Sequence, residues 1–186
     1  FLYSGYRRWG LEMQDDVTDA TLWAIAEGIT ERDSICIFGG SYGGYASLMG
    51  AVKEPDLYAC GIVYVGVYDL VMMLEEGDIP STQAGRNYLD QALGDDRVDL
   101  YQRSPINHLE KLTAPLLIVH GALDQRVPLM QAEALRERMD ALNKPYEWLV
   151  KPNEGHGFYN KDNKVELFST MLTFLENNLP SRSALK

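Results

Sequence analysis

One serine of the chain stands among glycines in a pattern that could make it a nucleophile. Ser41 is the central residue of "GGSYG", which matches the G-x-S-x-G pattern of a nucleophile elbow. In such an elbow the serine lies on a sharp turn between a strand and a helix, and flanking glycines let the neighbouring backbone approach without Cβ clashes. The alternative interpretation is a glycine-rich turn whose serine only begins a helix.

A serine hydroxyl attacks a carbonyl only when a base accepts its proton and an acid orients that base. Of the three histidines, only His156, in "NEGHGF", follows a predicted strand where a base is needed. His120 and His108 are interpreted as structural or surface residues. Asp124, in "HGALDQRVP", lies in the loop after an earlier predicted strand. Because an elbow serine is followed along the chain by the acid and then by the histidine, we predict the triad Ser41–Asp124–His156. Taken singly, the acid and the histidine could be a turn aspartate and a surface histidine.

The elements that must position these residues alternate between apolar strand-like runs and helical segments. Strands are predicted at residues 34–38, 59–65, 116–120 and 146–150, and helices at 11–28, 42–52, 81–93, 130–142 and 165–179. Almost continuously apolar strands are typical of a parallel sheet covered by helices on both faces. Active groups of such sheets gather beyond the carboxyl ends of the strands, which is where the three triad residues are expected.

The composition limits the classes of partner. The 186 residues are 46% hydrophobic and 24% charged, which fits one globular domain with a sizeable core. The net charge of −10 argues against a surface for nucleic acid or anionic membrane, because either needs clustered Lys and Arg. No apolar run approaches the roughly 20 residues of a membrane span. Nucleic acid and membrane are therefore not expected as partners.

No metal or cofactor is predicted. Three scattered histidines and two cysteines, Cys36 and Cys60, do not form a metal-ligand set. Both cysteines lie in strand-like runs, so we expect no disulfide between them, and they do not indicate a redox compartment. The glycines do not match the G-x-G-x-x-G pattern of dinucleotide binding.

The motifs together resemble those of the prolyl oligopeptidase family of serine peptidases. "GGSYGGY", "HGALDQRVP" and "EGHGF" are similar to its three signature blocks, and the chain is most similar to the dipeptidyl-peptidase and acylaminoacyl-peptidase branches. "WGLEMQDDVTDATLW" and "SPINHLEKLTAPLLIVHG" fit the same family, so the resemblance covers nearly the whole chain. It implies an α/β-hydrolase fold, with a mainly parallel sheet and helices on both faces. It also implies that Ser41 is the nucleophile, Asp124 the acid and His156 the base.

The resemblance further implies residues that bind the substrate. The backbone N–H of Tyr42 would be one donor of the oxyanion hole, and Arg126 matches a position that holds a substrate carbonyl in several relatives. Val67, Leu70 and Met73 fall where the family forms its specificity pocket. These aliphatic residues argue against a strict preference for proline, which in relatives often accompanies large aromatic residues. Alternatively, Arg126 is a surface residue without a role in binding, and the three aliphatic residues only pack in the core.

By the same resemblance, residues 1–186 are expected to form a single domain, the C-terminal two-thirds of a catalytic domain truncated at its N-terminal side. The early strands, the loop with the second oxyanion donor and the β-propeller of the family would lie outside this chain. We therefore expect an exposed edge at the first predicted strand and a homo-oligomer formed through it. We also expect the isolated chain to be weak or inactive, because losing one oxyanion donor typically costs about 10²–10³ in rate.

Three functions remain open at this point. The leading hypothesis is a serine peptidase that transfers an acyl group to Ser41 and then hydrolyses the acyl-enzyme with water activated through His156. A carboxylesterase or lipase would share the triad, but "YGGY" and "DQRVP" favour the peptidase. The third possibility is a non-catalytic interaction or scaffold domain. Such a domain has no physical need for all three triad residues, so their presence argues against it.

Overall fold

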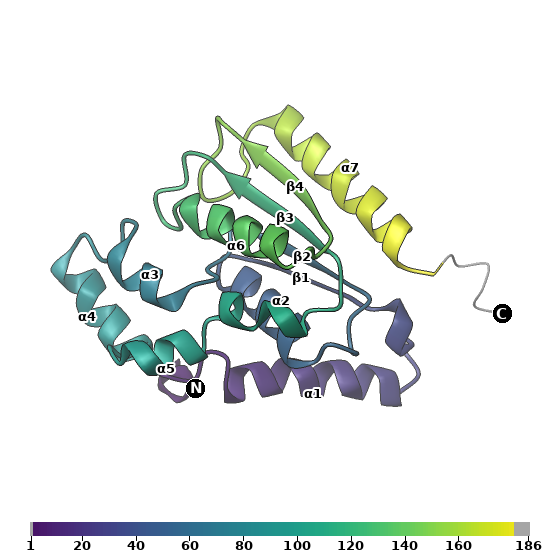
Figure 1. Ribbon diagram of the computed structural model, residues 1–186, viewed down its shortest axis with the longest axis horizontal. Helices are drawn as coiled ribbons and strands as arrows, with labels where there is room; N and C mark the ends of the chain where they lie inside the picture. Colours follow the sequence, from purple (N-terminus) through teal and green to yellow (C-terminus); the bar gives the residue numbers. More distant parts are fainter. Residues whose placement is uncertain (1, 181–186) are drawn as a thin grey trace.

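The computed structural model describes residues 2–180, in which four parallel strands form one sheet with helices on both faces (Figure 1). The strands are β1 (Cys36–Gly40), β2 (Cys60–Tyr64), β3 (Leu116–Gly121) and β4 (Tyr146–Lys151), and they lie in the order β1-β2-β3-β4. The helices are α1 (Glu12–Ala26), α2 (Tyr42–Lys53), α3 (Leu70–Glu75), α4 (Gln83–Ala92), α5 (Arg97–Gln102), α6 (Met130–Ala141) and α7 (Lys161–Asn178). Short 3-10 segments are found at Leu2–Gly5, Arg32–Ser34 and Pro105–Lys111.

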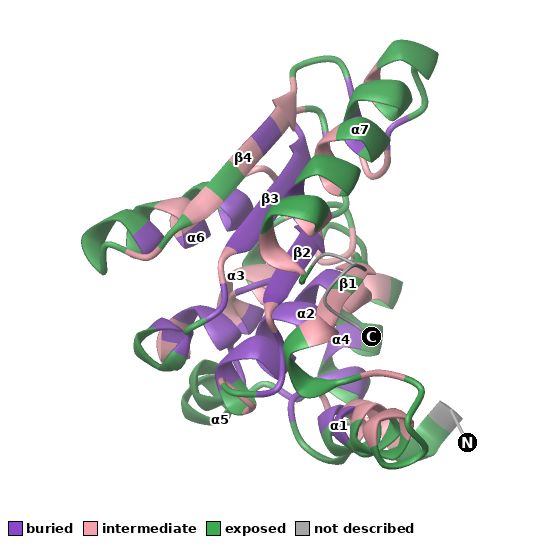
Figure 2. Cartoon of the chain, turned by 90° about the vertical axis from the view of Figure 1, so that its right-hand side faces the viewer, coloured by how far each residue is buried: buried purple, intermediate pink, exposed green. Residues whose placement is uncertain are grey.

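The two central strands, β2 and β3, carry the core. Figure 2 shows buried residues running along both of them, and every residue of β3 is buried. Leu116 and Ile118 belong to the cluster that packs under α2 and α6, whereas Leu117 and Val119 pack with the residues of α7. Because both faces of β3 are covered, its apolar run is continuous rather than alternating.

Helix α2 lies very close to the sheet because glycines remove side-chain bulk where the two meet. A Cβ on Gly39 would overlap the backbone of Gly43, and a Cβ on Gly44 would lie 2.7 Å from the Cα of Gly66. The elbow between β1 and α2 is therefore held in place by backbone-to-backbone packing.

Most predicted elements differ from the structure at their ends, and two of these differences have a clear local cause. β1 begins at Cys36 and ends at Gly40, rather than spanning 34–38, because Arg32–Ser34 forms a 3-10 turn. α7 begins four residues before the predicted start at 165. Its N-cap is Asn160, whose Oδ1 accepts hydrogen bonds from the N–H groups of Asp162 and Asn163.

The segment between β2 and β3 contains two helices that the sequence analysis missed. α3 and α5 have six residues each, and they flank the predicted helix α4. An aspartate caps each one: Asp69 accepts two backbone N–H groups at the start of α3, and Asp96 accepts two at the start of α5. This helical segment lies to one side of the sheet, at the left of Figure 1.

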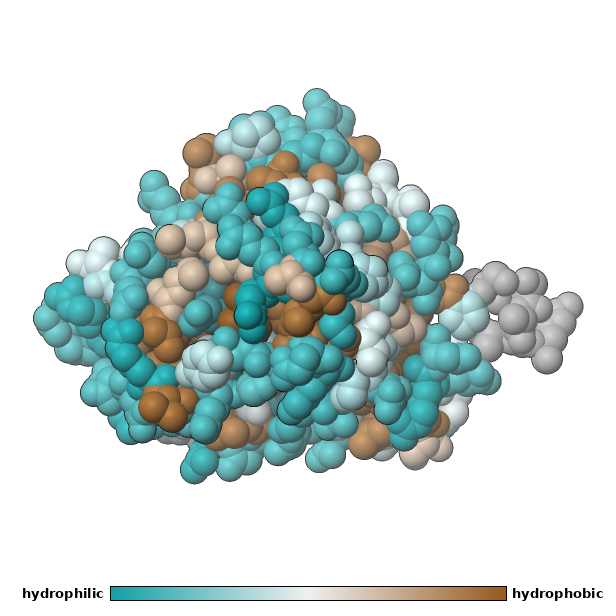
Figure 3. Space-filling model, in the orientation of Figure 1, coloured by the Kyte–Doolittle hydropathy of each residue, from teal (hydrophilic) through white to brown (hydrophobic). Residues whose placement is uncertain are grey.

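Strand β1 lies at an edge of the sheet among the described residues, because it pairs only with β2. Phe38, in the middle of β1, keeps 54% of its surface exposed. Cys36 and Cys60 are register partners across this pair, and both are free. The rest of the surface is mostly polar: in the view of Figure 3, hydrophobic side chains gather only in separate small groups. Within residues 2–180, no helix has the length and apolar character needed to cross a membrane.

Candidate active site

The three predicted triad residues meet beyond the carboxyl ends of β1, β3 and β4. Nε2 of His156 lies 2.9 Å from Oγ of Ser41, and Nδ1 of His156 lies 2.8 Å from Oδ2 of Asp124. Both are hydrogen-bonding distances. With Nδ1–H donated to the carboxylate, Nε2 of His156 is left as the acceptor of the hydroxyl proton.

Ser41 has the strained backbone of an elbow. Its φ of 57° and ψ of −118° are unusual for a residue with a side chain. The backbone is held there because the N–H of Ser41 donates to the carbonyl of Tyr64 at 2.9 Å, and the N–H of Gly44 donates to the carbonyl of Ser41. Although Ser41 is the N-cap residue of α2, its side chain makes no capping hydrogen bond. Its Oγ is directed instead to His156, which favours the elbow over a serine that only begins a helix.

The carboxylate of Asp124 is fully buried, and both of its oxygens have partners. Oδ1 accepts the backbone N–H groups of Arg126 and Val127, each at 2.9 Å, and Oδ2 faces His156. Two backbone donors on one oxygen fix the orientation of the carboxylate. Asp124 is thus prepared to orient His156 and to stabilise positive charge on its ring.

A second histidine, His120, supports the turn that holds Asp124. It is fully buried, and its Nε2 lies 2.8 Å from the carbonyl oxygen of Val127. Because a carbonyl only accepts, Nε2 must carry the hydrogen. Burial lowers the pKa of His120, so its ring is neutral near pH 7, and Nδ1 has no hydrogen-bond partner among residues 2–180. The backbone of Val127 is therefore held by two hydrogen bonds: its N–H donates to Asp124, and its carbonyl oxygen accepts from His120.

The loop that carries His156 is also anchored on both sides. On one side, the buried carboxylate of Glu154 accepts the backbone N–H groups of Tyr159 and Asn160. On the other, the N–H of Phe158 donates to the hydroxyl of Tyr64 on β2. These contacts fix the position of the imidazole relative to the sheet.

The backbone N–H of Tyr42 is available next to the nucleophile. Tyr42 is the first residue of α2, and the first N–H groups of a helix have no acceptor within it. The positive end of the helix dipole lies at the same place. Both features suit a position where negative charge develops on a substrate oxygen.

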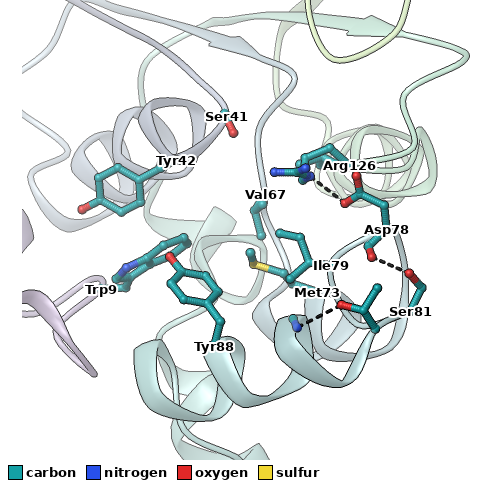
Figure 4. Close-up of a pocket in the computed structure, with 13 residues that line it drawn as sticks. Trp9, Ser41, Tyr42, Val67, Met73, Asp78, Ile79, Ser81, Tyr88 and Arg126 are labelled. Carbon is teal, nitrogen blue, oxygen red and sulfur yellow. Dashed lines mark hydrogen bonds and ion pairs between the residues drawn. The ribbon is translucent and has the colours of Figure 1, made fainter.

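A cavity of about 760 Å³ opens beside Ser41 (Figure 4). Its lining changes from aromatic at one end, through apolar, to polar at the other: Trp9, Tyr42 and Tyr88; Val67, Met73 and Ile79; then Asp78, Ser81 and Arg126. The aromatic end is fixed by ring contacts, since the centroid of Trp9 lies 4.5 Å from that of Tyr42. At the polar end, Nε of Arg126 lies 2.6 Å from Oδ1 of Asp78, and this hydrogen bond raises the pKa of Arg126.

Three of the four predicted pocket residues, Val67, Met73 and Arg126, line this cavity. The expectation for Leu70 was wrong: its side chain is fully buried in the core and does not line the cavity. The cause is local, because the N–H of Leu70 donates to the buried hydroxyl of Ser104 and draws the start of α3 inward.

Sequence reasoning also missed residues of the cavity. Trp9, Asp78, Ile79 and Tyr88 come from segments far from any predicted strand. No local sequence pattern marks Trp9 or Tyr88 as a cavity residue, because only tertiary contacts bring them close to Ser41. Within residues 2–180, no group of three His, Cys, Asp or Glu side chains is arranged to hold a metal ion.

Comparisons with known proteins agree on one family. A sequence model described as the prolyl oligopeptidase family matches residues 1–182. The chain is 36% identical to dipeptidyl aminopeptidase BIII of Pseudoxanthomonas mexicana, over 98% of this chain and 27% of that protein. It is 32% identical to dipeptidyl peptidase family member 6 of Caenorhabditis elegans, over 95% and 24% respectively. The chain thus spans about a quarter of the length of these relatives.

The fold has close counterparts among solved structures. A puromycin-hydrolyzing peptidase of Mycobacterium tuberculosis matches with a TM-score of 0.88 at 26% identity, over 95% of this chain and 27% of that one. Together with the parallel sheet and its helices on both faces, this similarity confirms the predicted α/β-hydrolase fold.

Proposed function

The chain belongs to the prolyl oligopeptidase family, and from that premise we propose that it carries the acylation site of a serine peptidase. Ser41 is the proposed nucleophile, His156 the base and Asp124 the acid that orients it. The observation that carries this proposal is the pair of hydrogen bonds at His156, 2.9 Å to Ser41 and 2.8 Å to Asp124.

The proposed reaction has two halves. As Oγ of Ser41 attacks the carbonyl carbon of a peptide bond, its proton passes to Nε2 of His156, and the carbonyl oxygen becomes an oxyanion near the N–H of Tyr42. His156 then gives the proton to the leaving amine, and the C–N bond breaks. In the second half, His156 takes a proton from water as the water oxygen attacks the acyl carbon. The bond between that carbon and Oγ of Ser41 then breaks, and His156 returns the proton to Oγ.

The cavity is the proposed site for the peptide. Its apolar middle, with Val67 and Met73, can enclose an uncharged side chain next to the scissile bond. Arg126 is the proposed donor to a carbonyl group of the peptide backbone, because its side chain borders the cavity that contains Ser41.

Labelling with a fluorophosphonate probe tests this proposal, because the probe forms an adduct only with an activated serine. In the protein that carries this chain, we expect one adduct by mass spectrometry, located at Ser41 and absent from Ser41→Ala. Ser47→Ala is the matched control, since Ser47 is a buried serine of α2, the helix that follows Ser41, and its loss should leave labelling intact. A folded protein without an adduct would contradict the proposal and support a scaffold domain.

The nature of the substrate separates the peptidase from an esterase. Amide hydrolysis demands better protonation of the leaving group than ester hydrolysis does. We expect turnover of aminoacyl anilides as well as of simple esters, and both activities should be lost in Ser41→Ala. Hydrolysis of esters alone would favour the carboxylesterase alternative.

We also propose that the exposed edge of β1 supports self-association of this chain. The unpaired N–H and C=O groups of an edge strand can pair with a second copy, and the exposed ring of Phe38 adds apolar area to that contact. Light scattering during gel filtration of the 186-residue chain should show a concentration-dependent dimer that Phe38→Lys weakens. A monomer at every concentration would refute this.

A further inference from the structure

The segment between α3 and α4 packs directly on the loop that carries Asp124. The backbone N–H of Asp78 donates to the carbonyl oxygen of Gln125 at 2.8 Å. Gly77, with a φ of 99°, allows the close approach, since a Cβ there would lie 2.7 Å from the carbonyl oxygen of Arg126. The two segments are therefore held together by backbone contacts alone, in addition to any contact between side chains.

The side chain of Asp78 adds a contact that fixes the arginine. Its Oδ1 lies 2.6 Å from Nε of Arg126, while the backbone N–H of Arg126 donates to Asp124 at 2.9 Å. Within residues 2–180, Nε is the only side-chain nitrogen of Arg126 with a hydrogen-bond acceptor. In Figure 4 the far end of the guanidinium points into the cavity, on the side where Ser41 lies. Both Nη groups thus keep their hydrogens for a ligand.

We propose that Asp78 is a positioning residue that orients Arg126 for a carbonyl group of the bound peptide. The inference rests on the proposed function. Arginine loses considerable rotamer freedom when it is ordered, and a side chain that is already held in its binding orientation avoids that cost when the ligand arrives. Asp78 accepts from Nε–H and leaves the donors of both Nη groups for the ligand.

The expected effect is modest, because both side chains are about half exposed, 51% for Arg126 and 42% for Asp78. Exposed ion pairs of this kind change an equilibrium by up to about fivefold. The effect should appear in KM, since a contact made equally in the bound substrate and in the transition state changes KM and leaves kcat unaltered.

The first test is the Asp78→Asn variant of the protein that carries this chain. It removes the charge but keeps the backbone donor to Gln125. We expect KM for a peptide substrate to rise about threefold to fivefold, with kcat and the midpoint of thermal unfolding unchanged. Glu76→Gln is the matched control, because Glu76 is an exposed carboxylate two residues away and should not change KM.

A double-mutant cycle shows whether Asp78 acts through the arginine. In an Arg126→Met background, which keeps the apolar stem, Asp78→Asn should cause no further rise in KM. An equal rise in both backgrounds would overturn the proposal, because Asp78 would then act on the substrate by itself.

A chemical readout keeps this inference separate from the proposed function. Phenylglyoxal modifies arginine side chains, and the rate at Arg126 can be followed by peptide mass spectrometry without any turnover. We expect faster modification in Asp78→Asn and no change in Glu76→Gln. Unchanged modification would refute the positioning role. Faster modification in a protein whose Ser41 resists fluorophosphonate would keep Asp78 as the partner of Arg126 and refute the peptidase instead.

Discussion

Asp124 and Arg126 lie two residues apart in one loop, yet the carboxylate of Asp124 is fully buried while the guanidinium of Arg126 is half exposed. The first is held by two backbone N–H groups and a histidine, and the second by one carboxylate at the surface. The same loop therefore presents a rigid side to the nucleophile and an adaptable side to the cavity.

The difference follows from the elements on each side. The triad residues follow β1, β3 and β4, whose positions are fixed by the sheet and the core. Much of the cavity wall comes from residues 67–88, where short helices and connecting segments carry the lining side chains. Placing chemical groups on rigid elements and binding contacts on connecting segments lets specificity vary while the reaction geometry is kept.

The largest effect is expected on the rigid side, from Asp124→Asn. The amide keeps the shape of the carboxylate but loses its charge, and it favours the wrong tautomer of His156. We expect kcat to fall by about 10⁴, with little change in KM, as measured by steady-state hydrolysis of an aminoacyl anilide. A loss smaller than tenfold would show that Asp124 is not the acid of the triad.

The second prediction concerns the packing that holds the elbow. A Cβ on Gly39 would overlap the backbone of Gly43, whereas a Cβ on Gly43 would meet nothing within 4 Å. Gly39→Ala should therefore reduce the free energy of unfolding by about 1–3 kcal/mol. Gly43→Ala lies within α2 and should be neutral or stabilising, by up to about 1 kcal/mol. Denaturant unfolding measures both, and equal effects would show that the approach of the backbones is not what fixes the elbow.

The rigid side was also the part that the sequence predicted best. The strands were predicted because each is a short, mostly apolar run. Ser41, Asp124 and His156 were selected because glycines and strand ends mark their positions. Most element ends differed by one or two residues. The start of α7 differed most, because the cap at Asn160 decides it, and a 3-10 turn decides the start of β1.

The adaptable side was predicted poorly, for a physical reason. Helices of six residues, such as α3 and α5, are too short to show a 3.6-residue period in the sequence. The aspartate at each N-cap is the only local signal of where they begin. Leu70 and Met73 are both apolar and three residues apart, so nothing local shows that the first is core and the second borders the cavity. Trp9 and Tyr88 reach the cavity through tertiary contacts that no local pattern encodes.

A third prediction concerns pH on the buried side of the loop. Burial lowers the pKa of His120 below its ordinary value of 6.5, so the unfolded chain binds a proton there more readily than the folded one. Stability from this residue should be fully present above about pH 6.5 and decline as the pH falls below it, by up to about 1.4 kcal/mol per pH unit.

The matched variant for this test is His120→Gln, which keeps an N–H donor for the carbonyl of Val127 but does not titrate. Denaturant unfolding at pH 7.5 and 5.5 should show a smaller loss of stability in the variant than in the wild type. An equal loss in both proteins would mean that His120 is not held neutral by the fold.

The smallest effect is expected on the adaptable side, where Met73→Ala enlarges the cavity beside Ser41. Relative kcat/KM should shift toward substrates with a bulkier side chain at the scissile bond, by about threefold to tenfold, with little loss of stability. Leu70→Ala, on the same helix but in the core, should instead cost about 2–5 kcal/mol of stability and leave the substrate preference unchanged. A panel of aminoacyl anilides and parallel unfolding curves measure both. If the two variants behaved alike, the wall of the cavity would be as rigid as the triad, and the contrast between the two sides of the site would fail.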